Sequence, residues 1–221
     1  MVCPQGHRTY TIAQELKFEI LFEIGANALL DGYYREAVAS MTTSLERFYE
    51  FYIQVIARKN KIDEAYIKKS WNIMSARSEM QSGAFLALYL METRKIDDSF
   101  IEEKKLTANG KVLSFKAFRN NVIHKGYIPT EDEAYIYGDY IYKFIWQIIE
   151  ELKKTAEEPM RIAITQRLSE LHQRHPDIKK STSCNRTIVS LSLKDPLAPN
   201  LRDAIQEIAK MRRVLSELPI K

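Results

Sequence analysis

The sequence predicts an all-α protein, with a helical bundle over residues 1–158 and a basic, mainly helical C-terminal extension over residues 159–221. Only 7 Gly and 7 Pro occur in 221 residues, which is few for a fold that needs frequent tight turns. Apolar side chains recur every three or four residues over long stretches, which is the spacing of an amphipathic helix. The composition, 45% hydrophobic and 28% charged, is that of a globular chain with a core.

Periodicity and helix-breaking residues give the order of the expected elements. They are a helix from Ile12 to Leu29, a second from Tyr34 to Lys59, a third stretch from Asp63 with a break at Ser82–Gly83 that resumes over 85–91, a charged loop over 97–108, a short helix over 112–124 with Val112 on its apolar face, a helix over 130–154, a basic helix over 159–175, an extended segment over 187–193, and a last helix over 200–218.

The helix expected over 130–154 carries two apolar stripes on different sides. One contains Tyr137 and Ile141, and the other contains Tyr142 and Trp146. A helix of this kind is either central to its own bundle or shared with a partner subunit.

Composition excludes several classes of protein. The first residues lack the pattern of a secretory leader, and no stretch of about 18 uncharged apolar residues occurs, so we expect a cytoplasmic protein with no membrane partner. Two cysteines are too few for a disulfide framework or a cysteine-based zinc site. No glycine-rich phosphate loop or dinucleotide fingerprint is present, so we expect no cofactor and no metal.

Positive charge is concentrated at the C-terminal end. Residues 1–158 carry a net charge of −2, whereas residues 159–221 carry +6. A basic segment of this kind is compatible with RNA contact, with a cover over a dimer, or with an ordinary solvated face.

The most informative segment is residues 119–124, Arg-Asn-Asn-Val-Ile-His. On a helix, Lys116, Asn120 and His124 share one face, so the Asn120 amide can orient the imidazole. Arg119 lies about 140° around the helix from His124. Arginine binds phosphate with a fixed bidentate geometry and histidine transfers protons near neutral pH, so this combination points to phosphodiester chemistry. The alternative is a surface histidine beside a helix end and an arginine in a salt bridge.

These residues resemble the RNxxxH motif of HEPN domains, which are helical bundles found in prokaryotic toxins, antiphage systems and RNA-processing enzymes. The context is similar, because three long helical stretches precede the motif and an aromatic-rich helix follows it. The resemblance covers about residues 10–155, so the expected bundle is HEPN-like and the C-terminal extension falls outside it.

The resemblance implies a metal-independent endoribonuclease of toxin–antitoxin or antiphage defence, in which a homodimer brings two copies of the motif into one cleft. By position, Arg119 would stabilise the phosphorane, His124 would act as general base or acid, and Asn120 would position them. Attack by the ribose 2′-hydroxyl would leave a 2′,3′-cyclic phosphate and exclude DNA. The implied partners are RNA, a second copy of the chain, and an antitoxin or other regulatory protein.

Three further residues are candidates for supporting roles. Glu46 lies on a predicted helix that resembles an early HEPN helix with a buried acidic residue, and it either contacts Arg119 or forms a local ion pair. Lys116 and Lys125 flank the motif and are candidates for holding RNA phosphates, or are simply solvated.

Two other readings of the whole chain stay open on the sequence alone. One is a catalytically silent module of the same fold that binds RNA or a protein partner. The other is a purely structural dimeric bundle in which the motif is a coincidence.

Overall fold

The computed structural model describes residues 6, 8–94, 96, 101–174, 179–185 and 187–216. Within that part of the chain it is 68% helical, with only short strands, which confirms the all-α prediction. No helix in the described ranges is long and apolar enough to cross a membrane.

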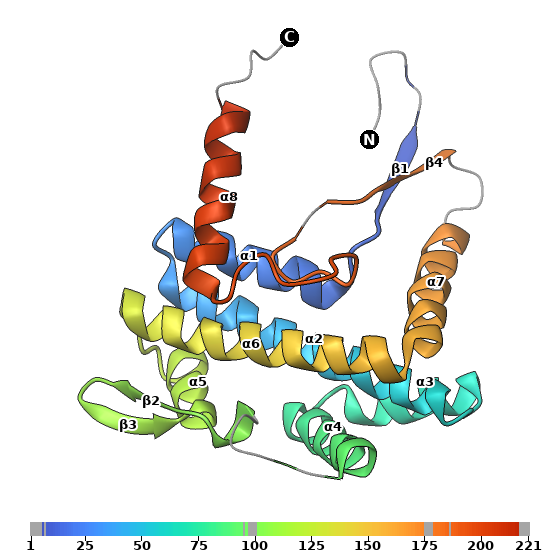
Figure 1. Ribbon diagram of the computed structural model, residues 1–221, viewed down its shortest axis with the longest axis horizontal. Coiled ribbons are helices and arrows are strands. Elements are labelled where there is room, and N and C mark those ends of the chain that lie inside the picture. Colours follow the sequence, from blue (N-terminus) through green and yellow to red (C-terminus); the bar gives the residue numbers. More distant parts are fainter. Residues whose placement is uncertain are drawn as a thin grey trace.

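The helices are α1 (Lys17–Leu30), α2 (Tyr34–Lys59), α3 (Glu64–Met74), α4 (Ser78–Thr93), α5 (Phe115–His124), α6 (Glu131–Thr155), α7 (Glu157–Gln173) and α8 (Leu201–Ser216), with a 3₁₀ turn at Ile101–Glu103. The strands are β1 (Thr9–Ala13), β2 (Lys105–Ala108), β3 (Lys111–Ser114) and β4 (Lys179–Ser183). Figure 1 shows α2 and α6 side by side across the longest dimension, with α1 on one side of them and α3, α4 and α5 on the other.

The start of the first helix was predicted too early. Residues 9–13 form strand β1, which pairs in parallel with β4, and α1 begins only at Lys17. Apolar Ile12 had suggested a helix, but the threonine-rich segment finds a strand partner about 170 residues away. The extended segment expected over 187–193 is not a strand, and β4 lies earlier in the chain.

The predicted break in the third helical stretch was also misplaced. The chain breaks at residues 75–77, between α3 and α4, whereas Gly83 lies inside α4. A glycine within a helix costs only about 1 kcal/mol relative to alanine, and the burial of Phe85 and Tyr89 on the same helix offsets that cost.

Residues 105–114 form a β-hairpin where the sequence predicted a charged loop and the start of a helix. Asn109 and Gly110 both have positive φ angles, 49° and 69°, as the two central residues of a type I′ turn require. Val112 therefore lies on β3 and is 70% exposed, and α5 begins at Phe115. The Ser114 side chain caps α5 by accepting a hydrogen bond from the Ala117 N–H.

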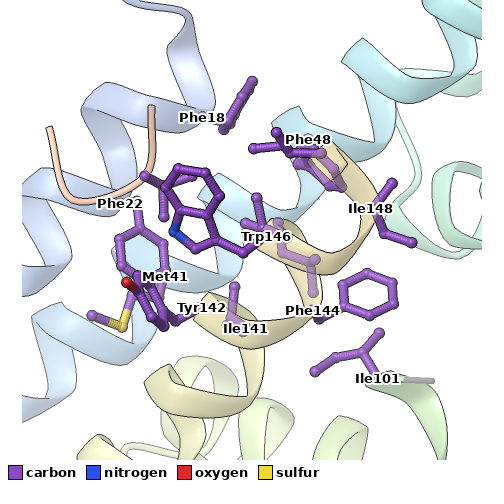
Figure 2. Close-up of a cluster of buried hydrophobic side chains, with 14 of the residues drawn as sticks. Phe18, Phe22, Met41, Phe48, Ile101, Ile141, Tyr142, Phe144, Trp146 and Ile148 are labelled. Atoms are coloured by element: carbon purple, nitrogen blue, oxygen red, sulfur yellow. The ribbon is translucent and has the colours of Figure 1, made fainter. Parts of the chain in front are cut away.

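The core is built around α2 and α6. Both stripes of α6 are buried, including Tyr137, Ile141, Tyr142 and Trp146, so this helix is central to its own bundle. Figure 2 shows aromatic and aliphatic side chains of α6 meeting those of α1 and α2, with Ile101 of the 3₁₀ turn at the edge of the cluster.

The C-terminal extension packs on the same core. Helix α7 begins at Glu157, two residues before Pro159. The first turn of a helix tolerates proline, because proline has no backbone N–H and an N–H at that position would have no intrahelical partner. Ile188 and Val189, together with Leu201 of α8, belong to the same hydrophobic cluster as the bundle residues. The division at residue 158 stays a prediction, and α8 is described as far as Ser216.

Three acidic side chains hold the backbone that leads to α8. Glu15, Glu19 and Glu23 accept hydrogen bonds from the N–H groups of Asn185, Leu191 and Ile188, respectively. Glu19 is 4% exposed, and its burial raises its pKa despite the N–H groups of Leu16 and Leu191 that favour the carboxylate.

We predict that Glu19→Gln makes stability less dependent on pH. Because the folded-state pKa of Glu19 lies above its ordinary value of 4.5, the folded protein binds this proton more tightly than the unfolded chain. The resulting stabilisation is fully present below pH 4.5 and is lost as the pH rises through the folded-state pKa. Urea unfolding from pH 4.5 to pH 7 should show wild-type stability declining relative to the variant. Exposed Glu36→Gln is the control, and a Glu19→Gln profile parallel to wild type would contradict the prediction.

Candidate functional site

The rotation of α5 is fixed by its buried face. Phe115 stacks on Tyr137 of α6 with ring centroids 4.2 Å apart, and Phe118 lies 5.3 Å from the same ring. Phe118 and Val122 are completely buried. Because these side chains anchor the helix, the polar motif residues between them are directed to its sides and to its exposed surface.

Arg119 projects from α5 into a small cavity between α2 and α4. Its guanidinium Nη2 lies 2.9 Å from Glu46 Oε1 and 3.2 Å from the Ser78 hydroxyl. The side chain is 17% exposed, and its Nε is buried without a hydrogen-bond partner. The cavity, about 60 Å³, is also lined by Lys116 and Tyr137. Arg119 is thus a positioned cation with an unused donor.

Glu46 makes the nonlocal contact that the sequence had left open. It pairs with Arg119, 73 residues away, and its side chain is 22% exposed. The local ion pair on this part of α2 joins Arg47 and Glu50 instead, at 2.9 Å. The contact is established by the structure, whereas a supporting role in catalysis stays a prediction.

His124 lies apart from the Arg119 cavity. It is the last residue of α5 and is exposed, and its side chain makes no hydrogen bond to another residue in the described ranges. Asn120 is half-buried, and its side chain likewise has no such partner within them. A single chain therefore does not bring Arg119 and His124 into one cavity, in keeping with their 140° separation around the helix.

The two flanking lysines lie at different cavities. Lys116 is at the rim of the Arg119 cavity, with its Nζ 3.9 Å from Glu79. Lys125 lines a second cavity of about 200 Å³ between α5 and the β2–β3 hairpin, together with Lys111 and Asn121. Positive side chains thus border both sides of α5.

Sequence reasoning proposed only Glu46, Lys116 and Arg119 among the residues that line this cavity, and it missed the others. Ser78 and Glu79 come from the first turn of α4, and Tyr137 comes from α6. The Glu79 backbone N–H, then Lys116 and Arg119, lower the pKa of the Glu79 carboxyl. The motif carried no signal for these residues, because only the packing of α4 and α6 brings them to α5.

The described part of the chain contains no cluster of three or more His, Cys, Asp or Glu side chains arranged to hold a metal ion. No family model, curated protein or solved structure matches this chain.

We predict a measurable coupling between Glu46 and Arg119. Replacing Glu46 by Ala leaves a partly buried guanidinium without its carboxylate, which should lower the free energy of unfolding by about 1–3 kcal/mol. A double-mutant cycle with Arg119→Ala, measured by urea unfolding, should give a coupling of about 0.5–3 kcal/mol. Glu36→Ala, at an exposed surface pair, should change stability by less than about 0.5 kcal/mol. Additive effects of the two cavity variants would show that the contact does not hold Arg119.

Proposed function

We propose that this chain is a metal-independent endoribonuclease that works as a homodimer, with Arg119, Asn120 and His124 as its catalytic residues. The observation that carries the proposal is the contrast along α5. Arg119 is held in a cavity by Glu46 and Ser78 with its Nε unused, whereas His124 is exposed about one and a half turns later. The motif thus provides a positioned cation and an accessible proton carrier.

The chemistry assigned to these residues is cleavage of RNA through its own 2′-hydroxyl. One histidine removes the 2′-hydroxyl proton, and the 2′-oxygen attacks phosphorus as the bond to the 5′-oxygen breaks. A second acid donates a proton to the departing 5′-oxygen. The Arg119 guanidinium faces the charge that develops on the phosphoryl oxygens. The products are a 2′,3′-cyclic phosphate and a 5′-hydroxyl end.

A dimer supplies what a single chain lacks. One His124 per chain does not readily serve as base and acid in the same step, and it lies away from its own Arg119 cavity. Two copies facing each other across α5 provide two histidines and two arginines. Val112 and Ile128, which flank α5 in sequence, are 70% and 74% exposed and are the apolar side chains that we assign to such contact.

We also propose a biological setting, which rests on the resemblance of the motif to HEPN toxins and defence proteins. An RNA-cleaving enzyme in the cytoplasm endangers its own cell unless it is held in check. An antitoxin or another regulatory protein is therefore part of the proposal, alongside RNA and the second copy. Lys116 and Lys125 are the side chains proposed to hold RNA phosphates beside the motif.

A second candidate function is a silent module that binds RNA or a protein partner without cleaving RNA. The observation that favours it is the pairing of Arg119 with Glu46, because a neutralised guanidinium stabilises a transition state less than a free one. Lysines on both sides of α5 would still attract RNA.

Substitution of the motif separates these functions. With total RNA and excess chelator, the unmodified protein should produce fragments with 2′,3′-cyclic phosphate ends. Arg119→Ala and His124→Ala should each reduce cleavage by at least about 10²-fold, because each removes either charge stabilisation or proton transfer. Gel electrophoresis and end-group analysis of the fragments provide the measurement.

Matched controls are His172→Ala and Arg161→Ala, which remove the same residue types from α7, outside the motif. Both should cleave like the unmodified protein, and all variants should keep the circular dichroism spectrum of the wild type. Full activity in the two motif variants would eliminate the nuclease proposal. If the unmodified protein and all the variants bind RNA and none of them cleaves it, the silent module would be favoured.

A further inference from the structure

A separate cleft, distinct from both cavities beside α5, lies where the C-terminal extension meets the bundle. It has a volume of about 230 Å³ and is enclosed by the start of α1, by α2 and by α7. It adjoins a cleft of about 240 Å³ on the α3 side, and Arg167 of α7 lines both. Neither cleft shares a lining residue with the Arg119 cavity.

Basic side chains outnumber acidic ones around this cleft, and the acidic ones are already engaged. The lining cations are Lys17, Arg47, Arg167 and Arg174, and the lining carboxylates are Glu50 and Glu170. Glu50 is paired with Arg47 at 2.9 Å, and Glu170 is paired with Lys68 at 2.7 Å.

Three cations are therefore left without a salt bridge to a described residue. They are Lys17, Arg167 and Arg174. The pKa of the Glu170 carboxyl is lowered mainly by Lys68, then by Gln166, and to a smaller extent by Arg174. Lys17 and Arg174 are exposed at the mouth of the cleft.

Arg167 is the one of these three cations that is only partly exposed. Its only hydrogen bonds within the described residues are long ones from Nη1, at 3.4 Å to the Ala13 carbonyl and 3.3 Å to the Gln14 carbonyl. Burial lowers its pKa, an effect opposed by Glu19 and then Glu15. Those two carboxylates lie beyond salt-bridge distance and accept backbone N–H groups instead. A partly desolvated guanidinium of this kind is stabilised by an anion that enters the cleft.

The apolar floor and the neighbouring aromatic residue narrow the choice of anion. Phe18 and Phe51 form part of the floor, and Trp71 lines the adjoining cleft. Three clustered cations suit a ligand with two or more negative charges, and arginine matches phosphate bidentately. A planar, partly apolar group attached to the phosphate would cover the floor and reach the indole, beside the Arg47 guanidinium that lies 5.4 Å from the ring centroid. The helix dipole at the start of α1 adds to the positive potential.

We propose that the cleft between α2 and α7 binds a nucleoside phosphate, with its phosphates on Arg167, Arg174 and Lys17 and its base toward Trp71. A free nucleotide and the phosphorylated end of an RNA strand offer the same chemistry. The site is separate from the motif, so it does not depend on the nuclease proposal.

Calorimetric titration of the full chain with two probes tests this site. One probe is adenosine triphosphate, and the other is a short 5′-phosphorylated RNA with 2′-O-methyl groups, which cannot be cleaved through a 2′-hydroxyl. The Lys17→Ala/Arg174→Ala variant changes only exposed side chains and should weaken binding by at least about tenfold. Arg167→Ala should do the same, and Arg167→Lys should restore part of the affinity.

The matched control is Arg161→Ala/Lys210→Ala, which removes the same net charge from exposed pairs elsewhere on α7 and α8. It should bind within about twofold of wild type, because exposed pairs contribute little. Bound nucleotide should also quench the tryptophan fluorescence of the protein, and Trp71→Phe should remove that quenching. Binding of both probes assigns the site to free nucleotides, and binding of RNA alone assigns it to a strand end. Equal affinity in the cleft and control variants, or no binding of either probe at millimolar concentration, would overturn the proposal.

Discussion

The burial of α2 on most of its circumference is the constraint on which the rest of the structure depends. This helix contacts α1, α3, α4, α5, α6 and α7, and its core residues Met41, Phe48 and Val55 are completely buried. A charged side chain on such a helix is accommodated best at a gap between neighbours. Glu46 lies at the gap with α4 and α5, and Arg47 lies at the gap with α7. Adjacent residues of one helix thus belong to two different clefts.

The same constraint sets the geometry of the motif. Because Phe115 and Phe118 anchor α5 against α6, and Glu46 reaches Arg119 from α2, the arginine cannot rotate toward the helix end that carries His124. A catalytic arrangement that joins the two residue types then needs a second chain. The Arg119–Glu46 pair has two opposing effects on catalysis. It positions the guanidinium, and it also neutralises part of its charge. Activity decides between them, and stability alone does not.

The sequence allowed prediction of the elements whose information is local. The apolar period of α2 and α6 was unambiguous, and the motif singled out Arg119, Asn120 and His124. Strand β1 could not be predicted because its partner, β4, lies about 170 residues away. The Asn109–Gly110 turn was a local hairpin signal that the apolar spacing of Val112 and Phe115 concealed. Ser78 and Arg167 gained their surroundings only from tertiary packing, so their sites had no signature in the sequence.

We propose that one active cleft needs the motifs of two chains, and mixed dimers provide the most direct test. Unmodified protein and His124→Ala protein would be unfolded together and refolded at several ratios, and cleavage would be measured at constant total concentration. If each cleft requires two histidines, activity should fall with the square of the unmodified fraction, because only dimers of two unmodified chains cleave. A linear fall, with each unmodified chain equally active beside any partner, would contradict a cleft shared by two chains.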